Sequence, residues 1–246
     1  MEVKKAIVFN DQHIPFEDKK INELVFDFIK DFKPDIIDIL GDLIDFWQIS
    51  KFDKNPNRKN TLQEDIDKTH IYLKNLRVIC PETEIELHSG NHLDRLRKYI
   101  WRQAEALECI RSLDIEFLLG LKELKISYLK NAEDYKKRNK LILTHGTVVS
   151  QESAMTARRN LKKYGLSVMC GHTHRGGSIY ITDLLGVRGA WENFCLCDFK
   201  LAKEWRMDVC NWQHGFSYIY YYPDRFEVHQ VPIIENKFTV LGKEYK

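Results

Sequence analysis

Five short motifs along the chain carry side chains of the kind that bind divalent cations. In sequence order they are Asp11-Gln12-His13, Gly41-Asp42-Leu43-Ile44-Asp45, Gly90-Asn91-His92, His145-Gly146 and Gly171-His172-Thr173-His174. Carboxylate, amide oxygen and imidazole favour manganese, iron or zinc over metals that prefer soft thiolate ligands. The six cysteines include no Cys-x-x-Cys pair, so they indicate free thiols and no thiolate zinc site. The motifs therefore indicate a metal centre of oxygen and nitrogen ligands.

The spacing within two motifs predicts how their side chains meet an ion. Alternate residues lie on one side of an extended chain, so Asp11 and His13 can reach one cation. His172 and His174 have the same spacing, but a turn between them can separate them onto two ions. Single residues also have ordinary alternatives, since Asp11 alone suits a cap or a turn. The joint occurrence of the motifs, and no single one, favours a metal site.

The motifs stand at the ends of predicted strands. Five β-rich or buried apolar runs precede them, at 6–9, 35–40, 84–88, 141–143 and 166–170. Amphipathic helices predicted over 18–32 and 61–79 alternate with the first three strands, which implies right-handed crossovers and a mainly parallel sheet. Ligands of open α/β sheets bind in the crevice outside the carboxyl ends of the strands. Five motifs in equivalent places therefore predict one shared site.

The second half of the chain supplies more strands than helices. A helix is predicted over 93–107, a charged hairpin turn at 136–140, and a helix over 151–164 with Ser150 as N-cap and Gly165 as its stop. Three more strand-like segments occur, at 179–182, 216–222 and 226–231, the last two as a terminal hairpin. A second sheet packed on the first is expected. No repeat or linker divides the chain, so residues 1–246 are predicted to form a single domain.

Composition sets the remaining bounds. With 246 residues, 43% hydrophobic and 12% aromatic, the chain can bury a sizeable core, which excludes global disorder. Its 38 basic and 36 acidic side chains leave a net charge of +2, too small to favour or exclude nucleic acid as a partner. The apolar run at 6–9 is too short for a signal peptide, and no run approaches the roughly 20 residues of a membrane span. A cytoplasmic protein without a membrane partner is expected.

The ordered set of motifs resembles the calcineurin-like metallophosphoesterases across residues 11–174. The resemblance implies an α/β fold, a four-layer α/β/β/α sandwich of two mixed sheets flanked by helices. It also implies hydrolysis of a phosphate ester by water activated between two divalent ions. Manganese is the preferred ion, with iron, zinc or nickel as alternatives. Segments 189–198 and 211–216 are similar to those of phage- and bacterial-type members in the repair-exonuclease-like branch.

The resemblance assigns a role to each residue of the motifs. The first metal would be held by Asp11, His13, Asp42 and His174. The second would be held by Asp42, Asn91, His145 and His172, with Asp42 bridging. His92 would contact substrate, stabilise charge on phosphorus and protonate the leaving oxygen. Asp45 would accept a hydrogen bond from His92 and fix its tautomer.

Departures from the family pattern bear on the substrate. Protein phosphatases of the superfamily carry Arg-Gly after Gly-Asp-x-x-Asp, and Phe46-Trp47 stands there in this chain, which weakens a protein-phosphatase reading. Aromatic side chains near the motifs can stack on bases, and they are Phe46, Trp47, Phe52 and Trp101. Basic side chains on two helices can follow a phosphodiester backbone, at 95, 97, 98 and 102 and at 158, 159, 162 and 163. Core packing and a solvated helix face are the ordinary alternatives.

The function expected from these residues is metal-dependent hydrolysis by a phosphodiesterase or nuclease that acts on nucleic acid or nucleotides. A phosphomonoesterase acting on small molecules or phosphoproteins is the alternative within the same chemistry. A binding scaffold that carries a metal site is the alternative of another class. The presence of every expected ligand favours an enzyme over the scaffold. Oligomeric state and the choice between DNA and RNA stay open.

Overall fold

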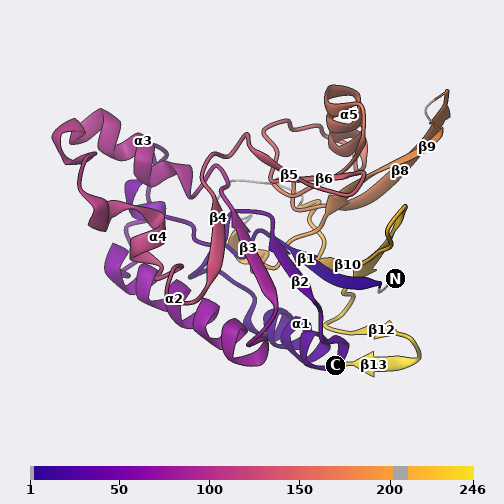
Figure 1. The fold of residues 1–246 in the computed structure, drawn as a ribbon. Helices are drawn as coiled ribbons and strands as arrows, with labels where there is room; N and C mark the ends of the chain where they lie inside the picture. The colour runs from indigo at the N-terminus through magenta and orange to yellow at the C-terminus, as the bar shows by residue number, and fades with distance from the viewer. Residues whose placement is uncertain (1–2, 185, 202–209) are drawn as a thin grey trace.

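The computed structural model describes residues 3–184, 186–201 and 210–246. Two mixed β-sheets pack face to face, and helices lie on the outer side of each (Figure 1). The four-layer α/β/β/α sandwich predicted from the sequence is confirmed. In these ranges no helix is both long and apolar enough to cross a bilayer. The cytoplasmic location stays a prediction.

The first sheet contains the strands that carry the first three motifs. Its order is β11-β10-β1-β2-β3-β4. The strands are β1 (Lys4–Phe9), β2 (Ile36–Ile39), β3 (Glu84–His88), β4 (Ile126–Leu129), β10 (Gly215–Tyr221) and β11 (Phe226–Pro232). β1 to β4 run parallel, and β10 pairs antiparallel with β1 and with β11. The carboxyl ends of β1, β2 and β3 therefore meet at one edge.

The second sheet carries the two histidine motifs. Its order is β5-β6-β7-β9-β8, and β6, β7 and β9 are parallel. The strands are β5 (Tyr135–Arg138), β6 (Leu141–Thr144), β7 (Ser167–Cys170), β8 (Gly176–Asp183) and β9 (Gly186–Asn193). A separate ribbon of β12 (Phe238–Val240) and β13 (Lys243–Tyr245) packs its two aromatic rings against Phe28. The hairpin of β10 and β11 confirms the one predicted near the C-terminus.

Helix ends follow the capping residues. The helices are α1 (Lys19–Phe32), α2 (Leu62–Ile79), α3 (Asp94–Gln103), α4 (Ile115–Leu118) and α5 (Met155–Tyr164), with 3₁₀ turns at Trp47–Ile49, Glu105–Leu107 and Arg111–Leu113. Asp18 accepts the Ile21 N–H at the start of α1, and Thr61 with Glu64 forms a capping box before α2. The helix predicted over 93–107 ends at Gln103 and continues as a 3₁₀ turn.

Three apolar layers hold the sandwich together. Between α1, α2 and the first sheet lies the largest, which includes Ile7, Phe28 and Leu73. A second joins the two sheets, where Val8 and Leu143 are fully buried. The third lies between α5 and the second sheet. Because the motifs belong to different sheets, this packing is what brings them within reach of one another.

The structure corrects two sequence predictions. Residues 136–140 are not simply a charged turn, because β5 runs to Arg138 and pairs antiparallel with β6. The predicted helix over 151–164 begins only at Met155, and Ser150 does not cap it. The Arg175 guanidinium donates to the carbonyl oxygens of Ser150 and Gln151, which keeps that segment non-helical. Both errors arise from contacts between segments far apart in sequence.

The charge on β5 is buried against acidic residues of the first sheet. Arg138 forms a bidentate pair with Asp38 at 2.9 Å, and Lys136 reaches Glu86 at 2.7 Å. Nε2 of His88 lies 3.3 Å from Glu86 and 3.7 Å from Asp38. Burial alone lowers the pKa of His88, but the two carboxylates raise it above its ordinary value. Arg138 also pairs with Glu84 at 2.9 Å, so an imidazolium at His88 balances the third carboxylate of the cluster.

This cluster predicts a pH-dependent stability. A histidine pKa that is higher in the folded than in the unfolded state stabilises the fold fully below about pH 6.5, and the contribution is lost as the pH rises through the folded value. We expect His88→Gln to cost more free energy of unfolding at about pH 6 than at about pH 8.5. Urea unfolding at the two pH values measures this, with His70→Gln as control because His70 hydrogen-bonds the Leu119 carbonyl. Equal costs at both pH values would contradict the assignment.

Candidate metal centre

The five motifs converge at the shared edge of the two sheets, and three of them contain aspartate or histidine residues in left-handed backbone. Positive φ angles occur at Asp11 (56°), His13 (51°), Asp42 (47°), His172 (73°) and His174 (59°). The extended geometry expected for Asp11 and His13 is therefore wrong, and two left-handed turns bring them together. Aspartate and histidine adopt this region more often than most residues, although at some cost. Such conformations cluster at functional sites, where the surrounding structure holds them.

Two glycines allow the motifs to approach closely. A Cβ on Gly41, whose φ is +91°, would lie 2.6 Å from Nδ1 of His145. On Gly90 it would lie 2.0 Å from Oδ1 of Asp42. Glycine is therefore required where backbone from one strand end passes a side chain from another.

Asp11, His13 and His174 form one candidate ligand group. Nε2 of His13 lies 3.0 Å from Nε2 of His174, and Oδ1 of Asp11 lies 3.6 Å and 3.3 Å from these two nitrogens. All three side chains are buried, and Oδ1 of Asp11 accepts no hydrogen bond in the described structure. Oδ2 of Asp11 accepts the backbone N–H of His172 at 2.9 Å, which fixes the carboxylate.

Asp42, Asn91, His145 and His172 form the second group. Nε2 of His145 lies 3.1 Å from Oδ2 of Asp42 and 3.0 Å from Oδ1 of Asn91. Ligand atoms of Asp42, His145 and His172 lie within 4.8 Å of one another. Asp42 and His13 also fall within that distance in a third group whose other member is His92, so Asp42 connects the two sets. His174 and His172 fall in different groups, as the turn between them allowed.

The donor atoms fit divalent cations. Nδ1 of His145 donates to the Leu40 carbonyl at 2.7 Å, so Nε2 is the nitrogen that faces the oxygens of Asp42 and Asn91 and would present its lone pair to a cation that displaces its proton. Converging lone pairs repel unless a cation lies among them. Ligands about 2.0–2.2 Å from one metal ion stand roughly 3.0–3.6 Å apart, which matches the separations among Asp11, His13 and His174 and those from His145 to Asp42 and Asn91. The residues therefore fit two ions, and their roles as ligands stay a prediction.

The pKa values of the histidines in the two groups shift in opposite directions. Burial lowers the pKa of His174 and, together with His145, lowers that of His172 to about 4, so both rings are neutral ligands at pH 7. Burial alone raises the pKa of Asp42, but His145 and His92 lower it well below its usual range. Burial alone lowers the pKa of His145, yet Asp42 raises it to about 9. Without a metal ion, a proton on His145 therefore neutralises the Asp42 carboxylate, and a bound cation would take over that role.

His92 and Asp45 lie beside the two ligand groups. Nδ1 of His92 lies 3.1 Å from both the carbonyl oxygen and Oδ2 of Asp45, the partner that the sequence predicted. The same Oδ2 lies 3.2 Å from Nδ1 of His13. Asp45 therefore orients two imidazoles at once. The Asp42 carboxylate accepts the backbone N–H of His92 at 2.8 Å and holds this segment against the second group.

Arg95 is a site residue that the sequence did not single out. Its guanidinium donates to the carbonyl oxygen of Asp45 at 2.8 Å, to Oδ1 of Asp45 at 3.1 Å and to Nε2 of His92 at 3.0 Å. It was predicted only as one of several basic residues on a helix. Its position three residues after His92, on the same helical face, was the available signal.

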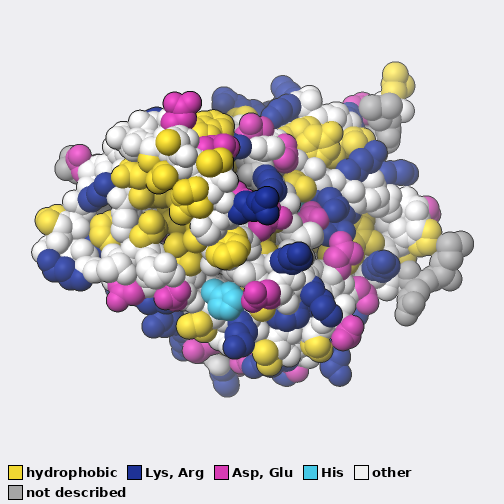
Figure 2. Space-filling model, turned by 60° about the vertical axis from the view of Figure 1, so that its left-hand side comes forward, with side chains coloured by type: hydrophobic (Ala, Val, Ile, Leu, Met, Phe, Trp, Pro, Cys, Tyr) yellow, Lys and Arg dark blue, Asp and Glu magenta, His cyan; other side chains and the backbone are white. Residues whose placement is uncertain are grey.

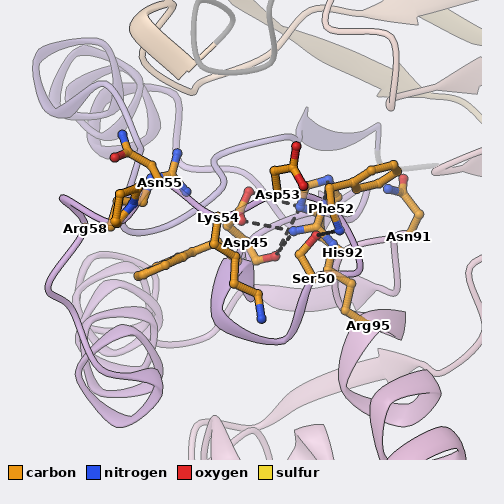
Figure 3. A pocket seen from close by; sticks show the side chains of 12 residues that line it. Asp45, Ser50, Phe52, Asp53, Lys54, Asn55, Arg58, Asn91, His92 and Arg95 are labelled. Atoms are coloured by element: carbon orange, nitrogen blue, oxygen red, sulfur yellow. Dashed lines mark hydrogen bonds and ion pairs between the residues drawn. The ribbon is translucent and has the colours of Figure 1, made fainter.

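A cavity of about 740 Å³ opens beside His92 (Figure 3). Its lining comes from the loop after β2, the turn after β3 and the start of α3, and includes Trp47, Phe52, Lys54, Arg58, Asn91 and Arg95, with the carboxylates of Asp45 and Asp53. The volume lies in the range of about 300–1,000 Å³ usual for small-molecule sites. Phe52 is 67% exposed, whereas Phe46 is fully buried and belongs to the core. Trp101 lines a different cavity, so the predicted aromatic cluster is reduced to Trp47 and Phe52.

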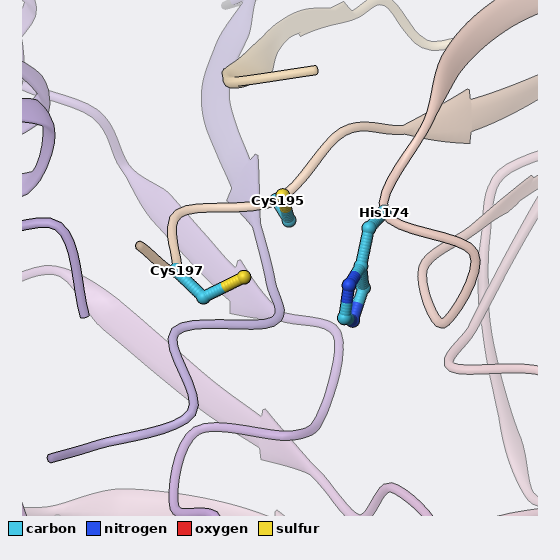
Figure 4. Close-up of side chains that lie close together, drawn as sticks. All are labelled: His174, Cys195 and Cys197. Atoms are coloured by element: carbon cyan, nitrogen blue, oxygen red, sulfur yellow. The ribbon is translucent and has the colours of Figure 1, made fainter. Parts of the chain in front are cut away.

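Two cysteines lie beside His174 (Figure 4). The sulfur atoms of Cys195 and Cys197 lie within 4.8 Å of a His174 ring nitrogen and of each other. Both are fully buried, with Leu201 and Trp212, and burial raises the pKa of both thiols. They are neutral thiols at pH 7, in agreement with the free, buried cysteines expected from the sequence.

Comparison with solved structures supports the same fold. Vps29 from Cryptosporidium parvum matches with a TM-score of 0.52 and 10% identity, over 99% of this chain and 98% of that one. Vps29 from Entamoeba histolytica, solved in complex with Zn²⁺, matches with a TM-score of 0.50 and 11% identity, over 98% and 99%. Vps29 has the calcineurin-like metallophosphoesterase fold, which is therefore the fold of this chain. No protein-family model matches.

Two relatives are similar along nearly their whole length. The Gene 54 protein of Mycobacterium phage D29 is 32% identical over 97% of each chain. That of Mycobacterium phage L5 is 31% identical over 99% of each. Neither name supports the repair-exonuclease-like branch, which stays a prediction. The chain belongs to the family of these phage Gene 54 proteins.

Proposed function

We propose that the chain is a two-metal phosphoesterase, and that its substrate is a phosphodiester of nucleic acid or of a nucleotide. The observation that carries the proposal is the meeting of seven buried or half-buried ligand side chains in two groups connected by Asp42. The zinc complex of the Entamoeba Vps29 supports divalent metal binding in this fold. Manganese is the preferred ion, because oxygen and imidazole ligands with no thiolate suit it.

The chain's own residues would bind and orient the reacting groups. A pair of divalent ions supplies, when bound, a strong nucleophile from water and positive charge at the phosphoryl oxygens. His92 lies at the mouth of the cavity and would donate a proton to the leaving oxygen, a contribution of roughly 10²–10⁴-fold. Asp45 accepts from Nδ1 of His92, which directs Nε2 toward the substrate side.

The cavity favours a diester with a base over a small monoester. Phe52 presents an exposed ring, and base–aromatic stacking is worth about 1–3 kcal/mol. Lys54, Arg58 and Arg95 give the lining cationic groups that suit a phosphate chain. A metal-dependent phosphomonoesterase remains the alternative, and a scaffold that binds metal without turnover is the alternative of another class.

The metal assignment predicts the effect of changing Asp42. We expect Asp42→Asn to weaken metal binding by about 100-fold or more, since even residues that only support ligands change affinity by 10–100-fold. Metal content after dialysis, measured by atomic emission, tests this. Asp67→Asn, on the exposed face of α2, is the matched control. A variant that retains two ions per chain at wild-type affinity would exclude Asp42 as the shared ligand.

The substrate assignment predicts a preference. With manganese, we expect the protein to cleave a single-stranded oligonucleotide with a higher kcat/KM than p-nitrophenyl phosphate, because only the former offers a base to Phe52. Chelation by EDTA should abolish both activities. The reverse preference would support the phosphomonoesterase. Metal binding without hydrolysis of either substrate would support the scaffold.

The acid role predicts a dependence on the leaving group. We expect His92→Asn to retain its metal but to lose roughly 10²–10⁴-fold in kcat on esters of alkyl alcohols. The loss in kcat should be much smaller on esters of p-nitrophenol, because p-nitrophenolate leaves without needing a proton. Rate measurements on a matched pair of diesters test this. Undiminished rates on the alkyl ester would refute the role.

A further inference from the structure

We propose that Arg95 binds the phosphate of the substrate, and so provides the phosphate-binding arginine that Phe46-Trp47 does not. This inference rests on the proposed phosphoesterase function. In the protein phosphatases of the calcineurin-like superfamily, the phosphate-binding arginine directly follows the motif Gly-Asp-x-x-Asp. In this chain Phe46 occupies that position and is fully buried in the hydrophobic core, so no guanidinium follows the motif at 41–45.

The guanidinium of Arg95 is placed by three hydrogen bonds. Nη1 donates to the carbonyl oxygen and to Oδ1 of Asp45, and Nη2 donates to Nε2 of His92. The side chain is 17% exposed, which is low for an arginine. Because its backbone N–H also bonds the carbonyl of His92 at 3.0 Å, the whole residue is fixed relative to the motif Gly90-Asn91-His92. Such preorganisation is typical of a binding group.

Arg95 keeps donors for an anion. A guanidinium has five N–H groups and no acceptor, and the protein contacts described above use three hydrogen bonds. Arg95 lines the 740 Å³ cavity together with His92 and Asn91 (Figure 3). Planar guanidinium groups match the oxygens of phosphate and can bind two of them at once. The remaining donors are therefore available at the wall of the cavity that also carries His92.

The distance to the ligand groups suits one phosphate. Nε2 of His92 stands between Arg95, at 3.0 Å, and Oδ2 of Asp42, at 3.9 Å. A phosphoryl group beside the ions held by Asp42 thus lies next to His92 and Arg95 together. Since Arg95 only donates, its bond to Nε2 uses the lone pair of His92. A phosphate oxygen, as the stronger acceptor, would take over that donor, and Nε2 would then take up a proton from water, which is the proton it donates to the leaving oxygen.

Charge also favours an anion at this wall. Among the described residues, Asp45 is the carboxylate that pairs with Arg95, and the same carboxylate also faces the rings of His13 and His92. The Asp45 carboxylate is therefore shared among three side chains, and its single negative charge does not fully neutralise the guanidinium of Arg95. The other cationic groups on α3 differ, because Arg97 and Lys98 both pair with Asp94 at 2.5 and 2.6 Å. Of the basic residues on α3, Arg95 is the one that lines this cavity.

Inorganic phosphate is the probe that tests the proposal. The full chain loaded with manganese is titrated with phosphate by calorimetry, and phosphate is assayed as a competitive inhibitor of bis(p-nitrophenyl) phosphate hydrolysis. We expect Arg95→Ala to weaken phosphate binding and to raise KM by about 10-fold or more, the effect of losing a hydrogen bond between charged groups. Arg95→Lys should recover part of the loss, since it keeps the charge but not the planar fork.

Arg102→Ala is the matched control. It removes an exposed arginine from the last turn of the same helix, outside the cavity, and should leave phosphate affinity at the wild-type value. Metal content and urea unfolding are measured for each variant. Added millimolar guanidinium should restore phosphate affinity to Arg95→Ala, which a loss of structure alone would not allow.

The outcomes separate this inference from the proposed function. Wild-type phosphate affinity in a folded, metal-loaded Arg95→Ala would overturn it. So would a loss that accompanies lost metal in both Arg95 variants and that guanidinium does not restore, because Arg95 would then be structural. If the wild type binds phosphate through Arg95 but hydrolyses neither substrate, the phosphoesterase proposal fails and the phosphate site stands.

Discussion

The site depends on the cost of burying carboxylates side by side. Asp11, Asp42 and Asp45 are almost completely removed from water, and an isolated buried charge is strongly unfavourable. Imidazoles of the same site face each of them, and those of His13 and His145 have raised pKa values as a result. Protons on these rings and divalent cations among the ligands are two ways of meeting the same electrostatic demand. A chain without such compensation would gain stability by replacing the carboxylates, so their presence favours a function that uses them.

The ligand set also depends on the packing of the two sheets. Asp11, Asp42 and Asn91 follow strands of the first sheet, whereas His145 and the 172–174 turn follow strands of the second. No local segment can form the site, because its halves meet only when the apolar layer between the sheets is closed. The ion pairs between β5 and the first sheet act at the same interface. Stability of that interface and geometry of the site are therefore linked, and a change in one should be measured in both.

Much of this could be predicted from the sequence, because it rests on local pattern. Apolar runs and helix caps located most elements, and polar residues at strand ends located the candidate ligands, whose role stays a prediction. The predictions that were wrong or incomplete concern residues whose conformation or role depends on contacts with other segments. Hydrogen bonds from Arg175 move the start of α5 toward the C-terminus. The charged residues of β5, which were predicted to form a turn, make ion pairs with the first sheet. The proposed role of Arg95 follows from its contacts to Asp45 and His92. The left-handed backbone at His13 was missed for a similar reason, since it is held by contacts that periodicity does not encode.

The fold by itself does not decide between turnover and binding, since one fold hosts many functions. The preference for turnover over binding rests on side chains that a protein which only binds metal would not need. Ligation requires Asn91 and the histidines of the two groups, but it does not require His92, whose Nδ1 is oriented by Asp45 while its Nε2 faces a cavity wall. Nor does it require a guanidinium 3.0 Å from that nitrogen. If His92 acts as the proposed proton donor and Arg95 as the proposed anion-binding group, they and the two sets of candidate ligands complete the arrangement that in-line attack on phosphorus requires, and this is the physical reason to prefer hydrolysis.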